Sequence, residues 1–124
     1  MKSPLAFVAL AMWLGLAHGA GEVAALKDTV ASRFRAGDVA LMKASVDQAL
    51  KSDQDGDTLA WKSDRSPASG TVTPLDRHTW KGLDCRRLRI VNTHGRLTEQ
   101  GVYRFCEKPA GRWKLVGPDR SALQ

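Results

Sequence analysis

The chain has 124 residues, of which 43% are hydrophobic and 26% are charged, and its 19 Lys and Arg against 13 Asp and Glu give a net charge of +6. This length allows one modest domain and excludes a multidomain enzyme. With 11 Gly, 5 Pro and a substantial apolar fraction, the chain is not collagen-like, low-complexity or disordered by composition. We therefore expect one small globular domain.

Residues 1–19 have the pattern of a secretory signal peptide. Lys2 precedes an apolar run from Leu5 to Leu16, which ends in Ala17-His18-Gly19-Ala20. A run of about 12 apolar residues is shorter than the roughly 20 that a membrane span needs. The small residues at 17 and 19 predict cleavage after Gly19, with no transmembrane segment in the mature chain. A buried or anchoring helix is the alternative.

Charge is distributed unevenly along the expected mature chain. Residues 20–75 carry 7 Lys and Arg and 8 Asp and Glu, whereas residues 76–124 carry 11 and 5. The basic character therefore belongs to the C-terminal half of the chain. Such a charge excess favours an anionic partner for this half.

Residues 20–51 are predicted to form a helical lead-in. Apolar residues recur at three- and four-residue steps between Glu22 and Leu50, which places one apolar stripe on a helix. Gly37 followed by Asp38 interrupts the run and offers an N-cap, so we expect two helices that meet near residue 37. The stripe, interpreted as facing the core, consists of Val23, Leu26, Val30, Phe34, Leu41 or Met42, Val46 and Leu50.

The sequence SDQDGD at residues 52–57 predicts a loop. Its carboxylates at Asp53, Asp55 and Asp57 resemble the start of a calcium-binding loop. However, Thr58 and Asp64 stand where that loop requires glycine and glutamate. We interpret the segment as a solvated acidic turn and expect no metal site.

Short segments bounded by turn residues predict a sheet domain over residues 52–124. Strands that follow one another without intervening helices indicate an antiparallel meander of four or five strands, with the preceding helices covering one face. The predicted fold class is therefore α+β, and a parallel nucleotide-binding sheet is not expected. The predicted strand segments are residues 58–62, 70–73, 76–80, 85–93, 97–108 and 112–116.

A two-residue turn at Gly95-Arg96 would place the two cysteines opposite each other. Glycine suits the first central position of a type II′ hairpin, and pairing outward from this turn sets Cys85 against Cys106. In an exported protein we expect these cysteines to form a structural disulfide. A redox pair and a metal site with His78 and His94 are the alternatives, but the cysteines lack the short spacing that such sites use.

The same register divides the hairpin side chains between two faces. Arg87, Arg89 and Arg104 share the cysteines' face as a basic strip, which Arg112 or Lys114 would extend. Arg87 opposite Arg104 is unfavourable unless an anion or a carboxylate lies between them, so we predict that the strip binds an anion or an acidic partner. A solvated face that keeps the protein soluble is the alternative. The other face is predicted core: Leu88, Ile90, Tyr103 and Phe105, extended by Trp113 and Leu115.

No catalytic motif is present, and we predict neither an enzyme nor a cofactor. The arrangement with most chemistry is His78 oriented by Asp76, with Ser66, Ser69 or Thr71 as a nucleophile, and nothing in the sequence selects it. Nucleic-acid binding is not expected, because no recognised motif is visible. Three tryptophans are interpreted as half-buried core residues, with stacking on sugar rings or bases as the alternative: Trp61, Trp80 and Trp113.

An ordered set of motifs between about residues 38 and 116 resembles the C-terminal domain of the bacterial seventeen-kilodalton surface antigen family. The set comprises Trp61, S-G-T-V-T-P at 69–74, G-x-x-C-R at 82–86, Gly95-Arg96, G-x-Y-x-x-C at 101–106 and G-x-W at 111–113. The resemblance implies an α+β antigen domain in the cell envelope, outer-membrane associated or surface-exposed, without enzymatic activity. Many members of that family begin as lipoproteins and carry a glycine-zipper segment, and this chain shows neither pattern.

Together these observations predict an exported, non-catalytic protein of the cell envelope, periplasmic or outer-membrane associated. Its partner would be an anionic envelope polymer or an envelope protein. A periplasmic inhibitor of an envelope-degrading enzyme is the alternative function, with residues 63–70 or the turn at 94–97 entering an active site.

Overall fold

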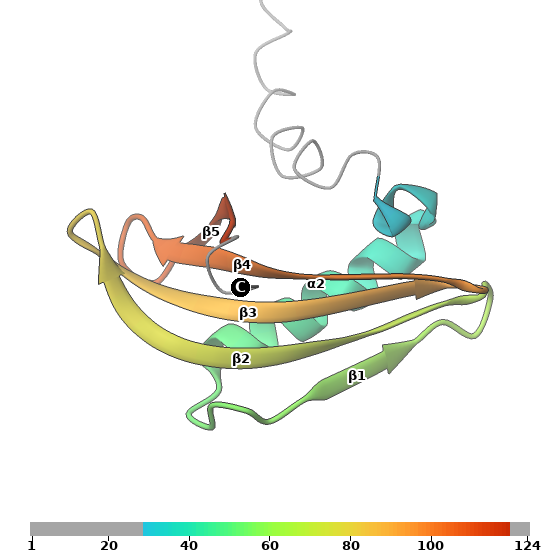
Figure 1. Cartoon of the computed structure of the whole chain (residues 1–124), viewed down its shortest axis with the longest axis horizontal. Helices are drawn as coiled ribbons and strands as arrows, with labels where there is room; N and C mark the ends of the chain where they lie inside the picture. Colours follow the sequence, from blue (N-terminus) through green and yellow to red (C-terminus); the bar gives the residue numbers. More distant parts are fainter. Residues whose placement is uncertain (1–28, 120–124) are drawn as a thin grey trace, which may run out of the picture.

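The computed structural model describes residues 29–119, which form one helix packed on a five-stranded antiparallel sheet (Figure 1). The strands follow the order β1-β2-β3-β4-β5, so each pairs with its neighbour in sequence. This confirms the predicted α+β meander. The elements are η2 (Val30–Arg33), α2 (Ala36–Lys51), β1 (Leu59–Lys62), β2 (Ala68–Trp80), β3 (Leu83–His94), β4 (Leu97–Glu107) and β5 (Trp113–Pro118).

The predicted signal peptide and the start of the helical lead-in lie outside the described residues, as do residues 120–124. Within residues 29–119, no helix has the length and apolar character needed to cross a membrane.

The lead-in differs from the predicted pair of helices. Val30–Arg33 is one turn of 3-10 helix, and α2 begins at Ala36, ahead of the predicted N-cap at Asp38. The Asp38 carboxylate instead accepts hydrogen bonds from the backbone N–H of Arg35 at 2.9 Å and from the hydroxyl of Ser66 at 2.8 Å. A carboxylate three residues after the N-cap can therefore close a capping box, and the bond from Arg35 lowers the pKa of Asp38.

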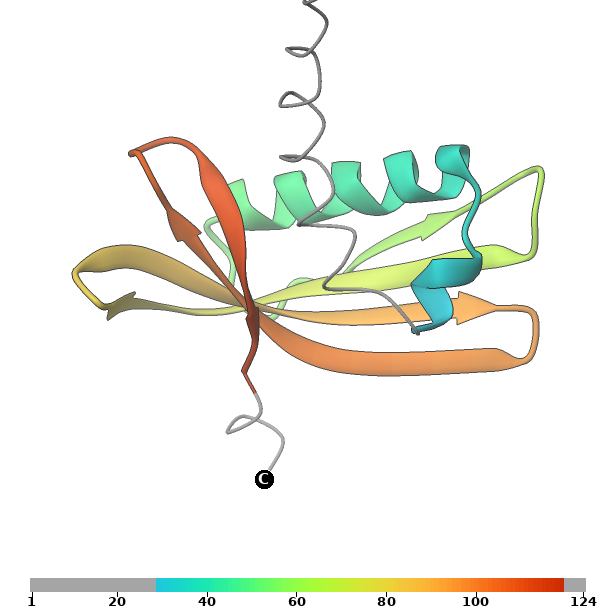
Figure 2. The same cartoon turned by 90° about the horizontal axis from the view of Figure 1, so that it is seen from above.

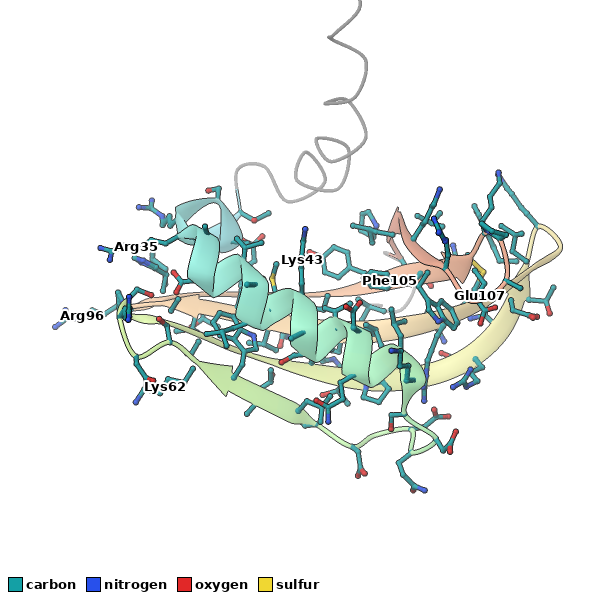
Figure 3. All side chains as sticks on the ribbon, turned by 180° about the vertical axis from the view of Figure 1, so that it is seen from behind. Arg35, Lys43, Lys62, Arg96, Phe105 and Glu107 are labelled. Carbon is teal, nitrogen blue, oxygen red and sulfur yellow. A yellow bond between two sulfur atoms is a disulfide. The ribbon has the colours of Figure 1, made fainter. Side chains whose placement is uncertain are left out.

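Helix α2 packs against β1, β2 and β3 and covers one face of the sheet, as Figures 2 and 3 show. Met42 is 4% exposed and takes the inward position, whereas Leu41 is 39% exposed. The predicted core face of the sheet is confirmed: three of its residues belong to the main cluster of buried residues, and Tyr103, Trp113 and Leu115 pack against that cluster. The main cluster consists of Ala49, Leu50, Val72, Leu88, Ile90 and Phe105.

The hairpin of β3 and β4 has the predicted register. His94 pairs with Leu97 around the Gly95-Arg96 turn, and Cys85 pairs with Cys106. Gly95 has φ +63°, which glycine adopts without the steric cost that a side chain would add.

Strand β2 is one long strand, so the prediction of separate strands at 70–73 and 76–80 is wrong. A register shift between Pro74 and Arg77 interrupts its pairing with β3 without ending it. The extra residue of this bulge reverses the alternation of side chains along β2. His78 and Trp80 consequently lie on the face away from α2, paired with Cys85 and Leu83.

Gly70 faces the indole of Trp61 at the junction of β1 and β2. A Cβ atom at this position would lie 2.6 Å from the indole nitrogen of Trp61 and 2.6 Å from the carbonyl oxygen of Val91. Because a backbone oxygen cannot rotate away, Gly70→Ala is expected to lower the free energy of unfolding by about 2 kcal/mol, measured by urea denaturation. Gly37→Ala in α2 has no heavy atom within 4 Å of the new Cβ and serves as the control. Equal stability of the two variants would contradict this account.

Candidate functional site

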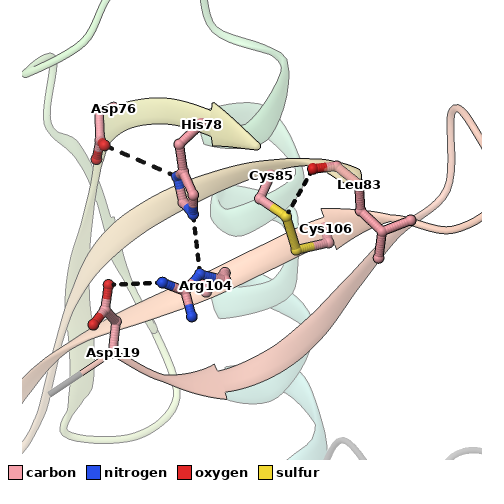
Figure 4. Close-up of a disulfide and its surroundings, with 7 residues drawn as sticks. All are labelled: Asp76, His78, Leu83, Cys85, Arg104, Cys106 and Asp119. Carbon is pink, nitrogen blue, oxygen red and sulfur yellow. Dashed lines mark hydrogen bonds and ion pairs between the residues drawn. A yellow bond between two sulfur atoms is a disulfide. The ribbon is translucent and has the colours of Figure 1, made fainter. Parts of the chain in front are cut away.

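The sheet face away from α2 carries a network of two arginines and two aspartates beside the disulfide. Figure 4 draws three members of this network, Asp76, Arg104 and Asp119, next to the two cysteines. Arg87 and Arg104 are directly opposite each other on β3 and β4. Arg87 donates through Nε to Asp76 at 2.7 Å and through Nη1 to Oδ2 of Asp119 at 3.2 Å. Arg104 donates to the same oxygen of Asp119 at 3.3 Å. The chain's own carboxylates thus relieve the repulsion predicted for this arginine pair.

Two features of the fold supply these carboxylates. The bulge in β2 presents Asp76 to Arg87 across the β2–β3 ladder. Asp119 directly follows β5, and its backbone N–H donates to the carbonyl of Val102 at 2.8 Å. With an exposed fraction of 7%, Asp119 is a buried acid held between two cations.

The Asp76–Arg87 hydrogen bond favours the charged forms of both partners. It lowers the pKa of Asp76 below its ordinary value and raises the pKa of Arg87, while burial acts in the opposite direction on each. A carboxyl group whose pKa is lower in the folded chain than in the unfolded chain stabilises the fold at neutral pH. For Asp76 this contribution is lost as the pH falls below the ordinary value of 3.8.

We expect the urea midpoint of the protein to decrease progressively as the pH falls below about 4, because Asp38 and Asp76 both have lowered pKa values. Asp76→Asn should lower the midpoint at neutral pH and flatten its dependence on pH below 4. Asp53→Asn, in the exposed loop, is the control. If Asp76→Asn has the same pH dependence as the parent protein, the ion pair does not contribute to stability.

His78 lies between the network and the disulfide. Its Nε2 accepts a hydrogen bond from Nε of Arg104 at 3.0 Å, which leaves the proton on Nδ1. Nδ1 faces Asp76, with 3.9 Å between that nitrogen and the carboxylate oxygen. The nitrogen that would act as a base is therefore occupied by a neighbouring arginine.

The structure does not bring His78 together with the candidate nucleophiles. The hydroxyl of Ser66 donates to Asp38 at the far end of the sheet. Ser69 and Thr71 lie further back along β2, and at about 3.3 Å per residue Thr71 is about 20 Å from His78. Asp76 does lie near His78, as the sequence suggested, but no described hydroxyl completes the arrangement.

The predicted disulfide between Cys85 and Cys106 is confirmed. The cysteines are 2% and 1% exposed, so both are buried from solvent. Within residues 29–119, no group of three or more His, Cys, Asp or Glu is placed to hold a metal ion.

Arg86 is a fully buried cation, and its sequence pattern predicted no role for it. Its Nη1 donates to the carbonyl of Ala49 at 3.0 Å and to that of Ser52, and its Nη2 donates to Asp55 at 2.6 Å. It therefore satisfies carbonyl groups at the C-terminus of α2, where the helix dipole also favours a cation. Asp55, which was predicted to be part of a solvated acidic turn, therefore also forms an ion pair with this buried cation. The sequence did contain a signal for this position: Arg86 is two residues before the core residue Leu88 on the same strand, so both side chains point to the core face.

The basic strip divides into paired and available cations. Arg87 and Arg104 are held by aspartates, whereas Arg89 is exposed and forms no hydrogen bond or ion pair within residues 29–119. Pairing with Cys106 places Lys114, and not Arg112, on this face. Lys62 on β1 lies on the same face, since it alternates with the buried Trp61.

Two of the three tryptophans occupy core positions, as interpreted from the sequence. Trp61 is 7% exposed and Trp113 packs against the main cluster. Trp80 differs, because the β2 bulge turns it to the face away from α2. There Lys81 and Arg104 lie 4.5 and 4.8 Å from the centre of its ring.

These features define a small α+β domain in which one helix covers an antiparallel meander, a disulfide joins β3 to β4, and an ion-paired network occupies the uncovered face. No protein-family model matches the sequence, and neither the curated proteins nor the solved structures give a match. The resemblance to the surface antigen domain stays a prediction from the motifs.

Proposed function

We propose that the protein is an exported, non-catalytic module of the bacterial cell envelope that binds an anionic envelope polymer through the sheet face opposite α2. One observation carries this proposal: among the described strand residues of this face cations outnumber carboxylates, and Asp76 and Asp119 are both engaged by arginines. The cationic side chains of the described strands on this face are Lys62, Arg87, Arg89, Arg104 and Lys114.

The paired and available cations have different roles in the proposal. The ion pairs of Arg87 and Arg104 with Asp119 join β3, β4 and the end of β5. Lys62, Arg89 and Lys114 lie on three different strands and supply the excess charge. A polymer with repeated negative charges would contact several of them at once, which favours a polyanion over an isolated ion.

Export and envelope location have separate support. The disulfide favours an oxidising compartment, and the N-terminal sequence has the pattern of a secretory signal. The motif resemblance to the surface antigen domain supports the envelope. A periplasmic location and an association with the outer membrane both agree with these observations.

Binding is tested by retention of the disulfide-bonded protein on isolated sacculi and on lipopolysaccharide at low and high salt. We expect retention at low salt that decreases as salt screens exposed charges. The double reversal Arg89→Glu/Lys114→Glu should weaken retention about tenfold or more, because two attractive contacts become repulsive. The control is Lys51→Glu/Arg96→Glu, which reverses two exposed charges outside this face, at the end of α2 and in the β3–β4 turn.

Equal retention of the double reversal and the control would contradict the proposal. Capture of one acidic envelope protein at both salt concentrations, without polymer retention, would replace the polymer with a protein partner. Inhibition of a lysozyme or a protease without polymer retention would instead establish the inhibitor alternative.

A further inference from the structure

An open hollow lies where the loop between α2 and β1 passes the bulge of β2. Figure 1 shows this loop below β2. The backbone N–H of Gly56 donates to the carbonyl of Pro74 at 2.7 Å and holds the loop against the strand. The volume of the hollow is about 610 Å³, within the range of small-molecule sites. Its lining combines two basic, two acidic and one aliphatic side chain: Asp55, Gly56, Leu75, Asp76, Arg87 and Arg89.

The basic side chains of the hollow retain hydrogen-bond donors. Arg87 and Arg89 are two residues apart on β3, so they lie on the same face of the sheet. Arg87 uses Nε and Nη1 for Asp76 and Asp119, and within residues 29–119 no hydrogen bond engages its Nη2 or the guanidinium of Arg89. One guanidinium group can bind a carboxylate through two parallel N–H donors, so Arg89 can hold a carboxylate in this way while Nη2 of Arg87 donates a further hydrogen bond.

The acidic side chains restrict how much negative charge a ligand can carry. Asp55 has one oxygen bound to Arg86, yet its side chain is 60% exposed. Asp76 has one oxygen bound to Arg87, and its side chain is 46% exposed. Each can accept hydrogen bonds from ligand hydroxyl groups, but both would repel a second negative charge beside the arginines. A polyphosphate or a dicarboxylate therefore fits the hollow poorly.

Leu75 supplies an apolar surface between these polar groups. Sugar rings combine C–H surfaces that pack on aliphatic side chains with hydroxyl groups that donate to carboxylates. The lining thus matches a hydroxylated ring with one carboxylate.

We propose that this hollow binds a single acidic sugar residue, with its carboxylate on Arg87 and Arg89, its hydroxyl groups on Asp55 and Asp76, and its ring against Leu75. The site rests on the proposed function, since it names the repeating unit that the basic face recognises in a polymer. The same chemistry is present in a free sugar acid, so the monosaccharide and the polymer are tested separately.

The test is an NMR titration of the ¹⁵N-labelled, disulfide-bonded protein with glucuronate, glucose and acetate at constant ionic strength. We expect saturable shifts of the amides of Gly56, Leu75 and Arg89 with glucuronate. Glucose lacks the carboxylate and acetate lacks the ring, so each should bind at least about tenfold more weakly. Glucuronate binding that does not saturate, or that equals acetate binding, would overturn the site.

Two substitutions separate charge from ring recognition. Arg89→Gln removes a carboxylate donor and should weaken glucuronate binding about tenfold, whereas Arg96→Gln should not. Leu75→Ala keeps every charge and should weaken glucuronate while leaving acetate unchanged. An equal effect of Leu75→Ala on both ligands would contradict a sugar site.

Retention on envelope polymers distinguishes the two proposals. If polymer retention persists while glucuronate binds no better than acetate, the proposed acidic sugar site is wrong. The proposal that the charged face binds an anionic polymer then stands. If glucuronate binds selectively while no polymer is retained, the site stands for a free sugar acid and the polymer-binding function fails.

Discussion

Replacing Arg86 with methionine is expected to lower the free energy of unfolding by about 3 kcal/mol. Methionine retains much of the aliphatic volume but removes every donor. The carbonyl groups of Ala49 and Ser52 at the end of α2 would then lose their buried partner, and Asp55 would lose its ion pair. Because Arg86 and Ala49 have no exposed surface, water cannot replace the bond to the carbonyl of Ala49 without opening the core.

Urea denaturation followed by far-ultraviolet circular dichroism measures this loss. Asp55→Ala is the matched control, since it removes the ion pair but leaves the carbonyl bonds of Arg86 in place. The Asp55 side chain is 60% exposed, so we expect less than half the loss of Arg86→Met. Equal losses in the two variants would show that the ion pair, and not the helix terminus, is the source of stability. A loss below about 1 kcal/mol for Arg86→Met would contradict the capping role altogether.

The double variant Cys85→Ala/Cys106→Ala is expected to lose about 3 kcal/mol of stability, because the disulfide closes a loop of about 20 residues in the unfolded chain. The disulfide also joins β3 to β4 beside Arg104 and His78, so its loss should loosen the ion-paired network (Figure 4). For a domain of this size, such a loss is a large fraction of the total stability.

The oxidised and reduced forms of the unmodified protein provide an independent measurement. Since both cysteines are buried, dithiothreitol should reduce the disulfide mainly when the chain unfolds. Urea midpoints of the reduced protein and of the double variant should agree, and both should lie well below that of the oxidised protein. A double variant as stable as the oxidised protein would show that the disulfide does not stabilise the fold.

Local sequence was sufficient to predict the hairpin of β3 and β4. The Gly95-Arg96 turn sets the register, and a two-residue periodicity assigns each side chain to a face. Opposition of the cysteines, the shared face of Arg87 and Arg104, and the core positions of Leu88 and Phe105 all follow from that one turn. The capping carboxylate at Asp38 was also visible, although its position within the helix was not.

The bulge in β2 was not predicted because an extra residue leaves no distinctive sequence pattern around Pro74. As a result, His78 and Trp80 could not be assigned to the face of the disulfide. The role of Arg86 was likewise missed, although a charged residue at a core position of the strand was a usable signal. Its acceptors come from a helix end more than 30 residues earlier in the chain.

The sequence by itself determined the fold class, the disulfide and the basic character of the uncovered face, because these depend on periodicity, turn geometry and charge counts. Only the tertiary structure decided which of these cations are ion-paired within the described residues. Arg87 and Arg104 are paired with Asp76 and Asp119, whereas Arg89 is not, and these contacts join residues between 11 and 32 positions apart. Contacts of that kind depend on how strands are brought together, and spacing along one strand does not encode them.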